Sequence, residues 1–258
     1  MTRMGVFDLD GRVAAVIGGT GVLGGAICHG LAQAGALVAV VGRSSERADA
    51  RVAALEASGG TAVAVLADST DPASVDAARR AIEQRLGPVD ILINAPGLNS
   101  STPFFDIELD EWQHILDANL TSVFVACQVF ARAMVDAGRG GSIINISSAS
   151  SGPPLSRVLT YSVAKAGLNN LTQYLARELA PHRIRVNAIA PGFFPAEQNR
   201  ALLSEDRLRA IMGHTPAARL GEPRELVGTA VWLASDAASG YVTGAIVRVD
   251  GGFSAMTI

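Results

Sequence analysis

The sequence is poor in the residues that mark several classes of protein. It has two cysteines in 258 residues, Cys28 and Cys127, and both fall in apolar stretches with helical spacing. Two isolated cysteines argue against a disulfide framework. The four histidines are scattered, without carboxylates at the spacing that metal ligands need. We therefore expect reduced core cysteines and no metal site.

Charge and apolar length exclude further classes. The net charge is −3 and no block of basic residues occurs, so no nucleic-acid-binding surface is expected. No apolar run approaches the length of a membrane span, and the first twelve residues carry acids where a signal peptide needs an apolar core. The sequence predicts a soluble, cytoplasmic protein that binds neither nucleic acid nor membranes.

Short apolar runs, in contrast, are abundant, and hydrophobic residues make up 49% of the chain. Seven runs rich in Val, Ile and Ala predict strands at 12–17, 37–42, 61–67, 89–94, 141–147, 184–190 and 245–250. Segments of helical periodicity separate them, at 22–35, 45–58, 72–86, 110–137, 159–181 and 223–235. This alternation predicts the α/β class: a single-domain, Rossmann-type, doubly wound parallel sheet of about seven strands with helices on both faces.

No linker or repeat divides the chain, so we expect one catalytic, dinucleotide-binding domain over residues 1–258. The segment at about 190–221 is distinct because it has prolines, mixed charge and no strand pattern. It follows the sixth predicted strand, at the sheet edge where such folds bind ligands. We interpret it as a substrate lid; the alternative is an ordinary surface excursion.

The stretch "VIGGTGVLGG" (16–25) lies between the first predicted strand and the first predicted helix. It fits G-x-G-x-x-G, and it nearly fits the wider G-x-x-x-G-x-G with a valine at the middle glycine. In this position glycines let a pyrophosphate approach the helix N-terminus. The alternative is a tight turn without a ligand. The predicted contacts are Gly18, Thr20, Gly21, Val22, Leu23 and Gly24.

The end of the second predicted strand indicates which dinucleotide binds. It reads "AVVGRSSER", with no carboxylate before Glu46. A carboxylate there binds the free ribose 2′-hydroxyl of NAD, whereas an arginine accommodates the 2′-phosphate of NADP. Arg43 and Ser44 therefore favour NADP, with NAD as the less favoured choice. The alternative is that Arg43 is a solvated loop charge.

The motif "YSVAK" places Tyr161 and Lys165 four residues apart in a predicted helix, so their side chains share one face. Lys165 is the only lysine among 21 basic residues; the other 20 are arginines. A compact ammonium lowers the pKa of a neighbouring phenol and fits where a planar guanidinium does not. A tyrosine activated in this way serves as acid or base in an alcohol–ketone interconversion. The alternative is a partly buried Tyr beside an exposed Lys.

Together "YSVAK", "INISS", "ILINAPG", "ANLTSVF", "VNAIAPG" and "VTGAIVRVDGG" resemble the short-chain dehydrogenase/reductase family over the whole chain. The resemblance implies a catalytic set of Asn119, Ser148, Tyr161 and Lys165, in which Ser148 binds the substrate oxygen and Asn119 helps hold a water in a proton relay to Lys165. The further cofactor contacts that it implies are Asp68, Ser69, Asn94, Ala95, Pro191, Gly192 and Phe194. It also implies a homotetramer, through the apolar segments 124–135 and 249–258.

The chain departs from the family pattern at Val22, Ala95, Pro96 and Ala196, and Val22 leads us to expect a modified turn in the glycine loop. Several stretches, among them "APGFFPAEQNRALL", resemble a branch of D-mannonate oxidoreductases or fructuronate reductases, which implies a sugar-acid or polyol substrate. The expected substrate contacts are Ser150, Arg157, Gln198 and Asn199, with Arg200 also considered. Two alternatives stay open: a 3-oxoacyl or other ketone reductase, and a dinucleotide sensor without turnover.

Overall fold

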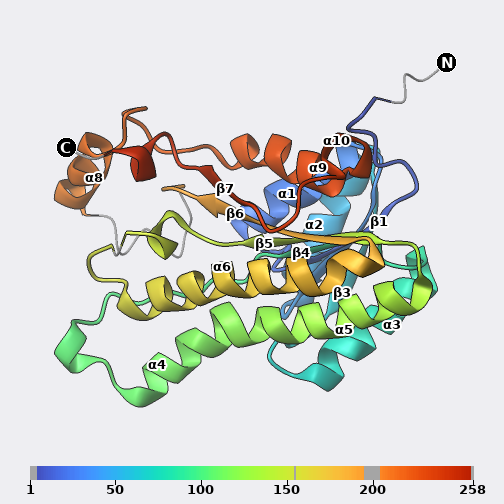
Figure 1. Cartoon of the computed structure of the whole chain (residues 1–258), viewed down its shortest axis with the longest axis horizontal. Helices are drawn as coiled ribbons and strands as arrows, with labels where there is room; N and C mark the ends of the chain where they lie inside the picture. Colours follow the sequence, from blue (N-terminus) through green and yellow to red (C-terminus); the bar gives the residue numbers. More distant parts are fainter. Residues whose placement is uncertain (1–4, 154, 195–203, 257–258) are drawn as a thin grey trace.

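The computed structural model describes residues 5–153, 155–194 and 204–256. One parallel sheet of seven strands forms its centre, in the order β3-β2-β1-β4-β5-β6-β7 (Figure 1). The strands are β1 (Val13–Ile17), β2 (Leu37–Gly42), β3 (Thr61–Leu66), β4 (Ile91–Asn94), β5 (Gly141–Ile146), β6 (Ile184–Pro191) and β7 (Ile246–Val249). The predicted fold class and the seven predicted strands are confirmed.

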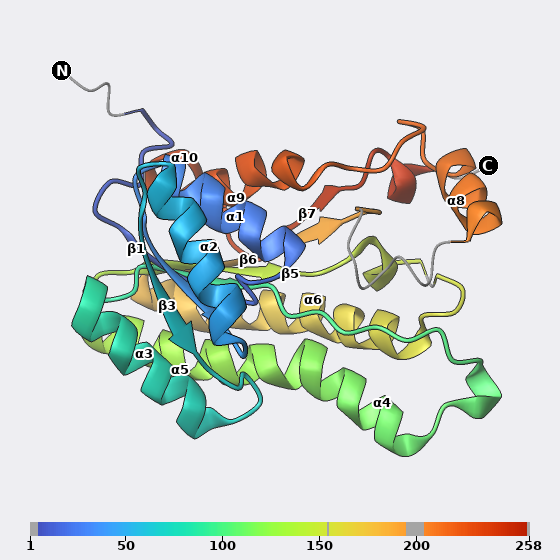
Figure 2. The same ribbon diagram turned by 180° about the vertical axis from the view of Figure 1, so that it is seen from behind.

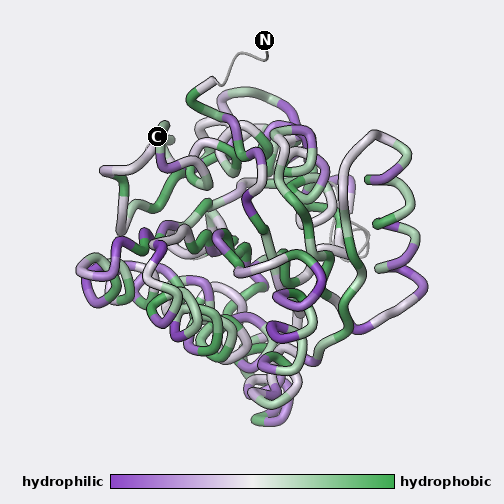
Figure 3. Tube along the Cα trace, turned by 90° about the vertical axis from the view of Figure 1, so that its right-hand side faces the viewer, coloured by the Kyte–Doolittle hydropathy of each residue, from purple (hydrophilic) through white to green (hydrophobic). Residues whose placement is uncertain are grey.

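Both faces of the sheet are buried, which explains why the strand sequences are continuously apolar rather than alternating. In β1, Val13, Ala15 and Ile17 belong to the core on one face. The intervening Ala14 and Val16 belong to the core on the other face. The helices, which pack only one side against the sheet, alternate between hydrophobic and hydrophilic residues along their length (Figure 3).

Two layers of helices cover the sheet (Figures 1 and 2). One layer contains α1 (Val22–Gln33), α2 (Ser45–Ala57), α9 (Val227–Ala234) and α10 (Asp236–Ser239). The other contains α3 (Pro72–Leu86), α4 (Leu109–Leu116), α5 (Ser122–Ala137) and α6 (Leu159–Leu179). Within the segment predicted as a lid, α8 (Glu205–Gly213) lies beyond the C-terminal end of β6 (Figure 1).

The helix predicted at 110–137 has an interruption that periodicity did not reveal. A π-helical turn, Asp117–Thr121, joins α4 to α5. The continuous helix Leu109–Ala137 is also long and apolar enough, by composition, to cross a membrane, contrary to our expectation for the sequence. Half of its most apolar window is buried, and Phe130 and Met134 pack into the core under the sheet. Packing within this fold accounts for its apolar character.

The carboxyl ends of β1 and β4 meet at the point where the strand order reverses, and open α/β sheets bind ligands at such points. Gly18, directly after β1, has a φ of +78°, and a Cβ there would lie 2.5 Å from the carbonyl oxygen of Ala95, directly after β4. The two loops are therefore in close contact, and a cleft opens beside them.

Candidate active site

The glycine loop follows the wider of its two possible patterns. The amide of Gly21 donates to the carbonyl of Gly18 (3.0 Å), and α1 begins at the next residue, Val22. A Cβ on Gly24 would lie 2.2 Å from the Gly18 oxygen, so Gly18 and Gly24 are both required by close packing. Val22 occupies the first helical position with its side chain 38% exposed, so that position does not need glycine. The N-terminal amides of α1, which have no partner within the helix, open towards the cleft.

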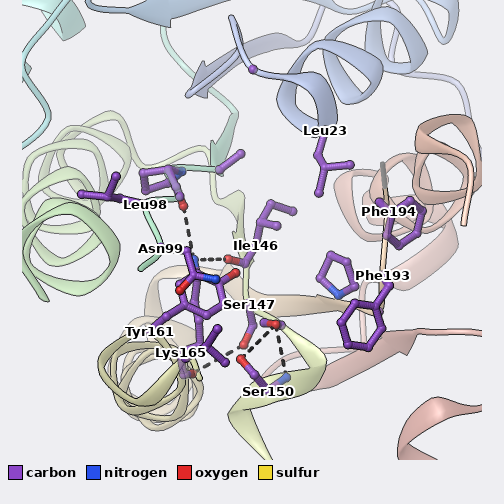
Figure 4. Close-up of a pocket in the computed structure, with 18 of the residues that line it drawn as sticks. Leu23, Leu98, Asn99, Ile146, Ser147, Ser150, Tyr161, Lys165, Phe193 and Phe194 are labelled. Carbon is purple, nitrogen blue, oxygen red and sulfur yellow. Dashed lines mark hydrogen bonds between the residues drawn. The ribbon is translucent and has the colours of Figure 1, made fainter. Parts of the chain in front are cut away.

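Residues from six parts of the chain line this cleft (Figure 4). They are Gly21, Val22, Leu23 and Gly24; Ala95, Pro96, Gly97, Leu98 and Asn99; Ile146, Ser147, Ser148 and Ser150; Leu155, Val158, Tyr161 and Lys165; Pro191, Gly192, Phe193 and Phe194; and Arg207. In Figure 4, Tyr161 and Lys165 lie side by side, and Phe193 and Phe194 lie on the opposite side of the cleft. The structure thus brings most of the predicted catalytic and cofactor residues together.

Lys165 is turned into the wall of the cleft and is only 1% exposed. Its ammonium nitrogen donates to the carbonyls of Ile146 (2.8 Å) and Pro96 (3.2 Å) and lies 5.5 Å from the centre of the Tyr161 ring. Burial lowers the pKa of Lys165 to about 7. A lysine at this pKa exchanges its proton near neutral pH.

Burial raises the pKa of the Tyr161 hydroxyl, and a hydrogen bond with the Ser148 hydroxyl opposes this effect. We expected the lysine to lower the pKa of Tyr161, and in the structure the net shift is upward. The reason is that burial disfavours the charged forms of both groups. Burial therefore favours the neutral phenol of Tyr161 and brings charged and neutral Lys165 into balance near pH 7.

Ser148 begins a short 3₁₀ turn, Ala149–Ser151, after β5. Its hydroxyl oxygen accepts from the amide of Ser150 (3.2 Å) and lies 3.1 Å from the Ser150 hydroxyl, which donates to it. Ser150 lines the cleft, as expected for a substrate contact. The Ser148 hydroxyl keeps its own proton, which it can donate to the Tyr161 oxygen.

Asn169, which the sequence analysis did not single out, fastens this turn to α6. Its side-chain oxygen accepts from the Ser147 hydroxyl (2.6 Å), and its amide nitrogen donates to the Ser151 hydroxyl (2.8 Å). Ser147 and Ser151 flank the turn that carries Ser148. Asn169 follows Lys165 by four residues, as Lys165 follows Tyr161, so the sequence alone places all three on one face of the helix.

Asn119 lies in the π turn and is fully buried, and it is absent from the cleft lining. Its amide nitrogen donates to the carbonyls of Leu98 (2.7 Å) and Ile115 (2.8 Å), and its oxygen accepts from the Leu98 amide (3.2 Å). Asn119 therefore anchors the loop after β4 from one side, while Lys165 holds Pro96 of the same loop from the other.

Asn94 does not contact the cleft, contrary to its expected role with the cofactor. It is fully buried, and its amide nitrogen donates to the Asn145 oxygen (2.9 Å) and the Cys127 sulfur (3.4 Å). As the last residue of β4 it points into the core beneath the sheet. The next residue, Ala95, lines the cleft, and its amide donates to the Ile17 carbonyl (2.9 Å).

The residues predicted at the adenosine end follow β2 and β3, outside the cleft itself. Arg43 is exposed and close enough to Asp68 to help lower the pKa of that carboxyl, although hydrogen bonds from Thr70 are the larger cause. The Ser44 hydroxyl caps α2 by accepting from the Arg47 amide (3.3 Å). Ser69 stands between Asp68 and Thr70 and is partly exposed.

Gly42 leaves no spare room beside it. A Cβ at Gly42 would lie 2.7 Å from the methyl carbon and 2.9 Å from the hydroxyl of Thr20, in the glycine loop. Thr20 is therefore packed against the end of β2 rather than lining the cleft.

The expected substrate contacts are only partly brought together. Arg157 is exposed, has a φ of +66° and lines a neighbouring hollow with Phe104 and Leu159 rather than the cleft. Gln198, Asn199, Arg200 and Ala196 lie outside the described residues. Arg207, on α8, lines the cleft and was missed, because one arginine among several in that segment carries no local signal. Within the described residues, no group of three His, Cys, Asp or Glu forms a metal site.

Comparison with known proteins agrees with this geometry. A family model described as enoyl-(acyl carrier protein) reductase matches residues 20–254. An uncharacterized oxidoreductase, UxuB, of Bacillus subtilis is 40% identical, over 96% of this chain and 96% of that protein. The 5-keto-D-gluconate 5-reductase of Escherichia coli (strain K12) is 36% identical, over 96% of this chain and 97% of that protein.

A crystal structure of a gluconate 5-dehydrogenase from Burkholderia cenocepacia in complex with NADP and tartrate superposes with a TM-score of 0.93. Its sequence is 35% identical, and the match covers 97% of this chain and 98% of that chain. The Escherichia coli and Burkholderia proteins are of the gluconate type and do not single out the mannonate branch that the sequence motifs suggested. The matches over nearly its full length show that the chain belongs to the short-chain dehydrogenase/reductase family of NAD(P)-dependent oxidoreductases acting on CH–OH groups.

Proposed function

We propose that the protein interconverts a secondary alcohol and a ketone on a sugar acid of the gluconate type, with NADP preferred as cofactor. The single observation that carries the proposal is the cleft, which joins the α1 N-terminus to Ser148, Tyr161 and Lys165. The activities named for the 5-keto-D-gluconate reductase and the gluconate 5-dehydrogenase support the substrate class. D-Mannonate and D-fructuronate are finer candidates within it.

The nicotinamide, when bound, supplies or accepts the hydride at the substrate carbon. The protein's own residues manage the oxygen and its proton. Ser148 donates a hydrogen bond to the substrate oxygen, and Tyr161 transfers the proton to or from it. Lys165 holds its ammonium 5.5 Å from the centre of the Tyr161 ring, where its positive charge favours the phenolate. Pro191, Gly192 and Phe194 line the cleft and are proposed to lie beside the nicotinamide.

The residues at the ends of β2 and β3 fit a 2′-phosphorylated adenosine. Arg43 is exposed directly after β2, and the carboxylate that would favour a free 2′-hydroxyl is absent from the end of that strand. Asp68, after β3, is proposed to contact the adenine. The NADP complex of the Burkholderia enzyme supports this assignment. The segment 190–221, through α8, is proposed to close over the substrate.

The proposal is tested by an activity screen with NADP and NAD. We expect turnover of gluconate, 5-ketogluconate, mannonate or fructuronate, and a higher kcat/KM with NADP than with NAD. A 3-oxoacyl thioester is the control substrate, because the matching family model bears an acyl-carrier name. Faster turnover of the thioester than of every sugar acid contradicts the substrate class. Cofactor binding without turnover of any of them identifies a sensor instead.

A further inference from the structure

The described charged side chains that line the cleft are all cations, and one of them has no role in the proposed proton transfer. Among the described residues that line it, two are cations, Lys165 and Arg207, and none is an Asp or Glu. Lys165 is 1% exposed and donates hydrogen bonds to the carbonyls of Pro96 and Ile146. Arg207 is therefore the cation that an anionic ligand meets in this part of the structure.

Hydrogen bonds hold Arg207 in place between α8 and the loop before α6. Its amide donates to the Ser204 hydroxyl that caps α8 (3.3 Å), which fixes the start of the helix. Its guanidinium crosses to Ser156 and donates to the hydroxyl (3.3 Å) and the carbonyl (3.0 Å) of that residue. These two bonds orient the guanidinium and join α8 to the loop before α6.

Arg207 has no carboxylate partner within ion-pair distance among the described residues. Arg209, two positions along the same helix, pairs with Asp206. A guanidinium carries five N–H donors, and Ser156 uses only part of them. The rest remain for an acceptor in the cleft, and their planar fork matches the two oxygens of a carboxylate.

We propose that Arg207 binds the carboxylate of the substrate, so that the cleft selects open-chain hydroxy acids over neutral polyols. The proposal rests on the proposed function, since it assigns the acid group of a sugar acid to this residue. Ser148 and Tyr161 hold the reacting oxygen at one end of the substrate, and Arg207 holds the charge at the other. The same contact ties a bound substrate to α8.

The kinetic test compares Arg207→Gln with Arg209→Gln, a matched change on the same helix. For the sugar acid that the wild type turns over, we expect Arg207→Gln to raise KM about 10- to 100-fold with kcat within about threefold. Arg209→Gln should change neither. For sorbitol, a neutral polyol, the KM of Arg207→Gln should equal that of the wild type. An unchanged KM for the sugar acid overturns the proposal and leaves the proposed function standing.

Binding supplies a readout that does not need turnover. Calorimetry of gluconate added to the NADPH-loaded wild type and to NADPH-loaded Arg207→Gln, in which no hydride can be transferred, should show at least a tenfold weaker Kd for the variant. If no sugar acid is turned over but gluconate binding depends on Arg207, the proposed function fails and the anion site stands. Equal binding of gluconate to both proteins, or binding to neither, overturns the anion site.

Discussion

At the scale of single residues, Tyr161 carries the most specific expectation. Tyr161→Phe removes the hydroxyl and keeps the ring on which the Lys165 ammonium packs. Loss of general acid–base catalysis costs on the order of 10²–10⁴ in rate, so we expect kcat to fall by that factor. Cofactor affinity, followed by nicotinamide fluorescence, should stay within a few fold. A variant that retains most of its kcat would remove Tyr161 from the mechanism.

Lys165 should lower the stability of the fold in a pH-dependent way. Its pKa is about 7 in the folded chain and 10.5 in an exposed reference state, so the unfolded chain binds more protons between these values. The folded state therefore carries the full penalty below pH 7 and loses it as the pH rises towards 10.5. We expect Lys165→Met to be inactive, yet more stable than the wild type by about 1–3 kcal/mol at pH 6, because lost hydrogen bonds offset part of the gain.

Urea unfolding of the wild type and of Lys165→Met at pH 6 and pH 9 measures this. The difference in the free energy of unfolding should shrink at the higher pH. A difference that does not change with pH would show that the lysine is buried without cost.

Arg43 decides the cofactor in our proposal. Arg43→Ala should lower kcat/KM with NADP by about ten- to a hundredfold, equivalent to about 1.5–3 kcal/mol for a hydrogen bond to a charged group, and leave NAD unaffected. Arg80→Ala, an exposed arginine on α3 paired with Asp76, is the control. The double variant Gly42→Asp with Arg43→Ala should prefer NAD over NADP only if the Thr20 side chain moves, since a side chain at position 42 would occupy the same space as Thr20. A higher kcat/KM with NAD than with NADP in the wild type would show that Arg43 does not determine the cofactor preference.

At the scale of elements, the first helix can be tested through its glycine. Gly24→Ala places a Cβ against the backbone of Gly18, which cannot move without disturbing β1. We expect a loss of about 1–3 kcal/mol in stability and weaker cofactor binding. Gly228→Ala on α9, where a Cβ meets nothing within 4 Å, should instead stabilise by up to about 1 kcal/mol. Thermal unfolding of both variants makes the comparison, and equal effects would contradict it.

Strands and helices were predictable because each strand is apolar on both faces and each helix has one apolar side. The π turn was not, because one extra residue in a helix changes the hydrogen bonds but hardly changes the pattern of apolar residues. Asn94 was assigned to the cofactor by its place in a motif, and the motif does not say which face of β4 the side chain takes. Asn169 and Arg207 depend on contacts between distant segments, Ser147 with α6 and Ser156 with α8, that no local pattern encodes.

At the scale of the whole molecule, the homotetramer remains a prediction. Large apolar side chains are exposed on neighbouring helices of one layer: Phe124 on α5 (47%), and Val163 (43%) and Tyr174 (59%) on α6. Exposed apolar surface of this kind marks contact between subunits. We expect light scattering to give a tetramer at micromolar concentration, and Phe124→Asp to lower the mass. A monomeric wild type at that concentration would contradict the prediction.

The π turn at Asp117–Thr121 also makes the chain length in this region critical. A π turn holds one residue more than an α-helical turn, so deleting one residue here would restore a regular helix in which α4 and α5 keep their faces in phase. The shortened helix would satisfy its own hydrogen bonds and keep its apolar composition. The loop after β4, however, would lose its anchor at Leu98. The extra residue of the π turn therefore serves the loop after β4 rather than the helix that contains it.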